Sequence, residues 1–260
     1  MSAMSDFWRR FRRNRGAVVG LVILGLVIAM AAFASVLFPG SPWDMATAPF
    51  VPPGEEGMLL GSDSLGRDVA AGIAHGARVS LMVGAVSTVA ALFIGVTLGA
   101  IAGYLGGVAD DAVMRFTEFF QTIPSFIFAI LLVAIFTPTI HSVVFAIAVV
   151  SWPPVARVVR AEFLSLRSRE FVQAAEVLGK SRIAIVVTDI LPNALSPIVV
   201  LSSLMVASAI LLESALSFLG LGDPNLMTWG FLIGSGRSVI RLAWWMSVFP
   251  GLAIFVTVLA

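Results

Sequence analysis

Three short strings in the sequence contain residue types that could do chemistry. The string GKS at 179–181 has the residues with which a glycine-rich loop holds phosphate. That motif needs an earlier glycine where Ala174 stands, and a strand where this chain predicts a helix. The string GLGD at 220–223 offers a carboxylate for peptide hydrolysis inside a membrane. Such chemistry needs a second carboxylate in the same site, which we sought in a Tyr-Asp pair on another span. The only tyrosine, Tyr104, precedes leucine rather than aspartate, so no second carboxylate is predicted.

The third string is GSG at 234–236, whose serine could act as a nucleophile with a histidine. His75 and His141 lie at span ends or in loops, and their spacing to Ser235 predicts no dyad. Two isolated histidines do not make a metal site, and without cysteine there is no thiolate site or disulfide. We therefore predict no catalytic residue, no metal and no cofactor of the chain's own.

The composition is that of a membrane protein. Hydrophobic residues make up 59% of the chain and charged residues 12%, against about 25% charged residues in soluble domains. The mean hydropathy is +1.01. A soluble fold of 260 residues could not cover this much apolar surface, which predicts that lipid is the solvent. The net charge of +1 gives no signal for nucleic acid.

The apolar runs predict six membrane-spanning helices in an all-α protein. A basic arm, 1–15, precedes a first span that is too long for a signal peptide. A polar loop, 39–76, separates that span from a core, 77–260, that holds five more and a polar insert at 157–190. Pro124 is expected to kink the third span, and Pro153-Pro154 to distort or end the fourth. The predicted spans are 16–38, 77–103, 113–136, the segment from 140 through Pro154, 194–219 and 242–260.

The cationic residues predict the orientation. Six spans put both termini on one side, and twelve of the sixteen cations lie with the arm, the 104–112 turn and the insert. By the positive-inside rule that side is the cytoplasm. The twelve are Arg9, Arg10, Arg12, Arg13, Arg15, Arg115, Arg157, Arg160, Arg167, Arg169, Lys180 and Arg182, and the four on the other side are Arg67, Arg78, Arg237 and Arg241.

The insert has a distinctive pattern of small residues. Two alanines are followed after four residues by Gly179, and a Leu-Pro pair stands twelve residues beyond that glycine. The alanines allow close approach to a partner, and the glycine permits a sharp turn between a helix at 168–178 and a second, amphipathic helix at 181–190. The residues of the pattern are Gln173, Ala174, Ala175, Glu176, Gly179, Leu191 and Pro192.

This pattern resembles the coupling loop of ABC-importer permeases. The usual glutamate is replaced by Gln173, and Asp189 stands where an apolar residue is usual. Further segments resemble the dipeptide/oligopeptide-type permeases, in order and over nearly the whole chain. They are LGSDSLGRD at 60–68, GARVSL at 76–81, LPNA at 191–194 and LSFLGLG at 216–222.

The resemblance implies the second permease of such a system, with the type I ABC-importer permease fold and a cytoplasmic coupling helix. It further implies a homologous second permease that completes the pathway, two ATPase subunits that bind ATP and Mg²⁺, and an extracytoplasmic solute-binding protein. The chain would lie in the bacterial inner membrane, in contact with lipid. The solute stays open, because similar permeases serve peptides, nickel chelates, glutathione, opines and sugars.

Glu213 and the pair Arg67–Asp68 are the remaining candidates. A carboxylate within the fifth span is costly unless it faces protein or water. Glu213 is therefore either a gate or partner contact at the extracytoplasmic mouth, or a hydrogen-bond partner for Ser214, Ser217 or the next helix. Arg67 and Asp68 could contact the binding protein, or form a local ion pair that orders the loop.

Two other classes of protein stay open at this point. A stand-alone secondary transporter would need charged or unwound sites near the middle of the membrane, and the second and third spans show none. An intramembrane protease would require Asp223.

Overall fold

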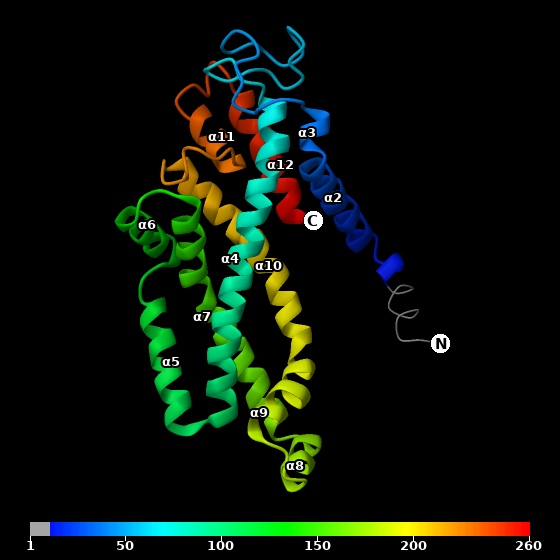
Figure 1. The fold of residues 1–260 in the computed structure, drawn as a ribbon, viewed down its shortest axis with the longest axis vertical. Helices are drawn as coiled ribbons and strands as arrows, with labels where there is room; N and C mark the ends of the chain where they lie inside the picture. The colour runs from blue at the N-terminus through cyan, green and yellow to red at the C-terminus, as the bar shows by residue number, and fades with distance from the viewer. Residues whose placement is uncertain (1–10) are drawn as a thin grey trace. The chain divides into compact units, whose positions relative to one another are not determined.

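The chain is all-helical in a computed structural model that describes residues 11–260 (Figure 1). Arg9 and Arg10 of the basic arm lie outside the described residues. Contacts divide the chain into two compact units, one formed by Met1–Val83 with Ile210–Ala260 and the other by Gly84–Ala209. The helices are α2 (Arg15–Ala32), α3 (Ala34–Leu37), α4 (Val69–Leu105), α5 (Gly107–Gln121), α6 (Ser125–Ile135), α7 (Ile140–Arg167), α8 (Glu170–Val177), α9 (Arg182–Ala184), the π-helix η1 (Ile185–Ile190), α10 (Leu191–Phe218), α11 (Trp229–Gly236) and α12 (Trp245–Leu259).

The described residues contain four helices long and apolar enough to cross a membrane, or five if one bent pair is a single span. The bent pair is α5 and α6, which meet at 80° across Pro124. The sequence predicted a kink there, and the structure has a complete break. α12, the predicted sixth span, is apolar but has only 15 residues. The helix lengths among the described residues therefore support four or five membrane-spanning helices, and the predicted sixth stays a prediction.

The unit Gly84–Ala209 is built on close contact between α4 and α7. A Cβ atom added at Gly95 would lie 2.4 Å from the Val155 side chain, and one at Gly99 would lie 2.5 Å from the Ala156 carbonyl oxygen. A Cβ atom added at Gly103 would lie 2.6 Å from the Cβ atom of Phe163. Glycines at intervals of four let membrane helices approach closely.

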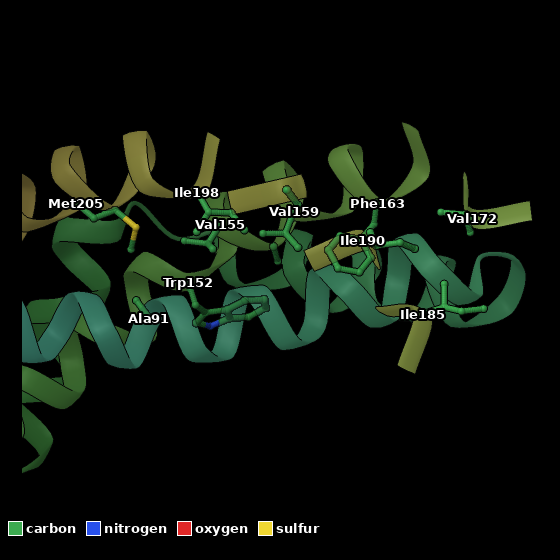
Figure 2. Packing of buried hydrophobic residues seen from close by; sticks show 12 residues of the cluster. Ala91, Trp152, Val155, Val159, Phe163, Val172, Ile185, Ile190, Ile198 and Met205 are labelled. Atoms are coloured by element: carbon green, nitrogen blue, oxygen red, sulfur yellow. The ribbon is translucent and has the colours of Figure 1, made fainter. Parts of the chain in front are cut away.

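The core of this unit runs along α7. Trp152, Val159 and Phe163 are buried, together with residues of α4, η1 and α10. Figure 2 shows these side chains in a row that ends at Val172 of α8. Burial of this row ties the insert to the helices that precede and follow it.

α7 continues through Pro153 and Pro154, where the sequence allowed it to end. Pro153 and Val155, on either side of the exposed Pro154, are buried, so packing holds the helix together where proline removes a backbone donor. The helix then extends to Arg167, so residues 157–167 of the predicted insert belong to α7. The guanidinium of Arg160 binds both carboxylate oxygens of Asp110, with Nη2 2.6 Å from Oδ2, and so joins α7 to the first turn of α5.

In the other unit, α2 packs against α12, and α11 also packs against α12. Gly20 lies against the backbone of Ala260, where an added Cβ would be 2.7 Å from the carbonyl oxygen. Arg78 donates to the carbonyls of Ala31 and Ala32, the latter at 2.9 Å. A cation at a helix C-terminus satisfies carbonyls that have no partner within the helix.

The segment 39–68 is a turn-rich loop without helix, as predicted, and two tryptophans tie it and α4 to the rest of the unit. Trp245 Nε1 donates to the Ser62 carbonyl oxygen at 3.0 Å, and Trp229 Nε1 donates to that of Ile73 at 3.0 Å. α4 begins at Val69, earlier than the predicted second span.

Candidate functional site

The short helix α8 is anchored to the unit Gly84–Ala209 by one face. Val172 is fully buried and belongs to the same cluster as Phe163, Ile185 and Ile190 (Figure 2). Gln173, Ala174 and Glu176 lie on the exposed side, while Ala175 is half-buried against the cluster. The alanine pair is thus divided, because Ala174 faces outward and Ala175 helps to seat the helix.

Gly179 forms the turn that the sequence predicted. Its φ is +76°, a conformation that glycine adopts without steric cost. The Gly179 N–H donates to the Glu176 carbonyl oxygen at 2.9 Å, and the Lys180 N–H donates to that of Ala175 at 3.1 Å. These two bonds are those of a Schellman C-cap, which ends α8 abruptly and reverses the chain.

Gln173 makes a hydrogen bond that explains its departure from the usual glutamate. Its side-chain amide donates to the Ser168 carbonyl oxygen at 3.3 Å, across the start of α8. A carboxylate could not donate this bond. The amide thereby links α8 to the end of α7.

The end of α8 carries two exposed apolar residues that the sequence reasoning missed. Val177 is 88% exposed and Leu178 is 85% exposed. Many apolar side chains of this chain are exposed, but these two lie outside the helices that are long enough to cross a membrane. Their signal in the sequence was a Val-Leu pair directly before the turn glycine, in a segment otherwise rich in polar residues.

Beyond the turn, Asp189 has a partner that accounts for the second departure from the pattern. Lys180 Nζ lies 2.6 Å from Asp189 Oδ2 and 2.7 Å from Thr188 Oγ1. Asn193 donates to the Asp189 backbone carbonyl at 2.6 Å. Asp189 thus holds η1, the helical segment after the turn, against Lys180 in the turn.

Leu191 and Pro192 follow η1 without a break, so the second arm and α10 form one helical stretch, Arg182–Phe218. The Leu191 N–H bonds to the Val186 carbonyl, five residues back, as in a π-helix. Pro192 has no N–H to donate, and the widened turn before it accommodates that loss. The sequence predicted two separate helices here, at 181–190 and 194–219, and the structure joins them.

Glu213 lies in α10, 2% exposed, and is surrounded by hydroxyl donors. Ser217 Oγ and Thr228 Oγ1 each donate to Glu213 Oε1 at 2.8 Å, and Ser214 Oγ lies 3.4 Å from Oε2. Thr228 also caps α11 by accepting from the Phe231 N–H. Glu213 is therefore a hydrogen-bond partner for Ser214, Ser217 and Thr228, which was one of its two predicted roles. Its other predicted role, as a gate or partner contact, stays a prediction.

Arg67 pairs with a different carboxylate from the one predicted. Its Nε lies 2.8 Å from Asp63 Oδ2, and its guanidinium carbon lies 5.0 Å from the centre of the Trp43 ring. Asp68 instead accepts from the Ala70 N–H at 2.8 Å, at the start of α4. The predicted ion pair between Arg67 and Asp68 was wrong: Arg67 pairs with Asp63, and Asp68 caps α4. A contact of either residue with a binding protein stays a prediction.

Two of the three strings considered first for chemistry lie in turns or loops, and the third, GSG at 234–236, forms the end of α11. Gly179 and Lys180 form the cap described above, and Asp223 accepts from the Asn225 N–H at 3.0 Å in a loop. No group of three metal-binding side chains was found among residues 11–260.

The fold is similar to that of a solved ABC importer. Two inward-facing crystal forms of the MetNI methionine ABC transporter contain a chain that matches this one with TM-scores of 0.59 and 0.52. Each match covers 72% of this chain, and 91% or 96% of the solved chain, at 19% or 18% sequence identity. The fold is therefore that of a type I ABC-importer permease.

The family follows from the sequence comparisons. Residues 95–260 match the model of the binding-protein-dependent transport system inner membrane component, and residues 2–53 match the N-terminal transmembrane domain of oligopeptide transport permease C. The chain is similar to the di/tripeptide transport system permease protein DppC of Pseudomonas aeruginosa, with 37% identity over 100% of this chain and 88% of that protein. It is also similar to the oligopeptide transport system permease protein OppC of Escherichia coli, with 41% identity over 98% of this chain and 86% of that protein.

The chain belongs to the family of binding-protein-dependent inner-membrane transport components, in its dipeptide/oligopeptide permease branch. It is a multi-pass permease subunit of an ABC importer.

Proposed function

We propose that the chain forms half of a translocation pathway for short peptides. A homologous permease completes the pathway, two ATPase subunits bind ATP and Mg²⁺ and drive transport, and an extracytoplasmic binding protein delivers the solute. Peptides are proposed because DppC and OppC, the relatives described above, carry peptide transport in their names. The chain itself contributes no chemical step.

The observation that carries the proposal is the exposed face of α8. Val172 fixes the helix to the cluster, and the cap at Gly179 leaves Val177 and Leu178 projecting without cover in the described chain. An ATPase subunit that bound this apolar tip would pull directly on η1 and α10, since α8 packs against η1. We infer that Gln173, Ala174, Glu176 and Gly179 form the coupling surface, together with Val177 and Leu178, and that Ala175 seats the helix beneath that surface.

The experiment is purification of the tagged chain from its native membrane in mild detergent, followed by mass spectrometry. We expect a second permease and ATPase subunits in stoichiometric amounts. Leu178→Asp should release the ATPase subunits and keep the second permease. Leu59→Asp, at another exposed leucine, should release neither. A wild-type chain that purifies alone would contradict the proposal.

Orientation has its own test. The distribution of arginines and lysines supports a cytoplasmic N-terminus and a cytoplasmic α8. Because the chain has no cysteine, Ser168→Cys places one thiol on it, at an exposed position between α7 and α8 and outside the proposed coupling surface. A membrane-impermeant thiol reagent should label that thiol in inverted vesicles and not in spheroplasts. Labelling in spheroplasts and not in inverted vesicles would show that α8 lies outside the cytoplasm and would contradict the predicted orientation.

A further inference from the structure

Two adjoining cavities lie in the unit Gly84–Ala209, where α4 ends beside the insert. The first, about 340 Å³, has an almost wholly apolar wall that includes Ile101 of α4 and Ile183 and Val186 of the insert. The second, about 360 Å³, has a largely polar wall. Both volumes lie within the range of about 300–1,000 Å³ that is usual for small-molecule sites.

The two cavities are continuous in their linings. Tyr104, Leu105 and Arg182 contribute to both. Arg182 therefore stands at the boundary, with an apolar groove on one side and a polar chamber on the other. A ligand that filled both would have an apolar part and a polar part joined near this guanidinium.

The charge around the polar chamber is positive on balance. Arg167 and Arg182 line it, with Glu176 as the one acidic residue and Gln173 beside it. Arg167 uses Nη1 to donate to the Tyr104 carbonyl oxygen at 3.0 Å. The Arg182 guanidinium makes no hydrogen bond or ion pair with any residue in the described range 11–260. It is thus the cation with unused donors.

The site lies at the level of a membrane–water boundary. Between Arg78 and Asp110 the sequence has no charged residue, so α4 leaves the apolar layer near its end at Leu105. Tyr104 stands at that end, and tyrosine is enriched where membrane proteins meet the headgroups. The ion pair Arg160–Asp110 marks the polar side of the same boundary.

We propose that these cavities bind one anionic phospholipid, with an acyl chain in the apolar groove and the phosphate at Arg182. Basic pockets at the ends of membrane helices bind anionic headgroups in this way. The combination of apolar groove and cationic chamber favours an amphiphile over a segment of protein, which would need an apolar face and an acidic group in the same short span. Because η1 and α8 line the site, the bound lipid would rest against the coupling loop.

The test uses the full chain, purified with its partner subunits and reconstituted in bilayers. A bimane label is placed at Val187→Cys, an exposed position one turn beyond Ile183 that lines neither cavity. A second, separate label is placed at Val199→Cys, an exposed position on α10 outside both cavities. Quenching is then measured with brominated phosphatidylglycerol and with brominated phosphatidylcholine.

We expect phosphatidylglycerol to quench at Val187→Cys at a lower mole fraction than phosphatidylcholine, and both lipids to quench equally at Val199→Cys. Arg182→Gln should reduce that preference about fivefold, the usual contribution of one basic residue to anionic-lipid binding. Arg182→Lys should keep it. Arg169→Gln removes an exposed arginine that lines neither cavity and should leave it unchanged.

Equal quenching by the two lipids at Val187→Cys would overturn the proposal. So would quenching by neither lipid at that site with normal quenching at Val199→Cys, because protein would then cover the groove. A preference that survives Arg182→Gln and falls in Arg169→Gln would also overturn it, since the charge would act from outside the cavities.

Discussion

Lys180 Nζ lies 2.6 Å from Asp189 Oδ2 and joins the two arms of the insert across the turn at Gly179. The ion pair stands between α8, which is proposed to receive the ATPase subunit, and η1, which leads into α10. The pair therefore connects the turn that ends α8 directly to η1.

Breaking this pair should affect coupling more than stability. Both side chains are partly exposed, and such pairs contribute up to about 1 kcal/mol, so Lys180→Ala should lower the unfolding temperature by at most about 4 °C. We expect a lower ratio of solute transported to ATP hydrolysed in proteoliposomes. The exchange of Lys180→Asp with Asp189→Lys should restore the ratio, and failure of that exchange would show that the pair itself is not responsible.

Gly179 should tolerate no β-branched residue, for a purely conformational reason. No atom lies within 4 Å of an added Cβ, but φ is +76°, which costs other residues about 1–2 kcal/mol. Gly179→Val should let the chain insert and assemble while ATP hydrolysis loses its link to uptake, and Gly179→Pro should do the same. Gly25→Val is the control, because Gly25 also has open space and lies in an ordinary helix. Equal uptake by the two valine variants would contradict the role of the turn.

Gly99 should be sensitive to size. An added Cβ would lie 2.5 Å from the Ala156 carbonyl oxygen, so Gly99→Leu must push α4 from α7. Overpacking costs about 1–3 kcal/mol, and the unfolding temperature in detergent should fall by about 2–12 °C. Gly251→Leu, in α12 with nothing within 4 Å, should change it little. Thermal unfolding followed by size-exclusion chromatography measures both.

Glu213 should be replaceable by glutamine and not by leucine. Glutamine keeps an acceptor for the hydroxyls of Ser217 and Thr228, whereas Glu213→Leu leaves these buried donors without their partner at about 1–3 kcal/mol each. The unfolding temperature and the rate of uptake should both fall in the leucine variant, and both should stay near the wild-type values in the glutamine variant. A glutamine variant that is fully stable and does not transport would instead establish the gate.

Local patterns in the sequence predicted the features that depend on a few neighbouring residues. Gly179 could be placed in a turn because it directly follows a short amphipathic segment. The loop before α4 was also predictable from its polar composition.

Features that depend on distant contacts could not be predicted in this way. Pro153 remains within α7 because packing against α4 holds the helix together. Arg67 pairs with Asp63, whose other carboxylate oxygen also accepts the Arg67 N–H, while the adjacent Asp68 caps α4. Asp189, a misfit to the family pattern, finds Lys180 only once the insert has folded back. In each case the partner is set by the fold.

The packing of α2 against α12 has a consequence for the order in which the protein is made. The unit Gly84–Ala209 is one uninterrupted stretch and can close as soon as that stretch has left the ribosome. The other unit joins residues before Val83 to residues after Ile210, and α2 meets α12 only within it. α2 must therefore stay in the bilayer without its contact to α12 until the ribosome has translated α12.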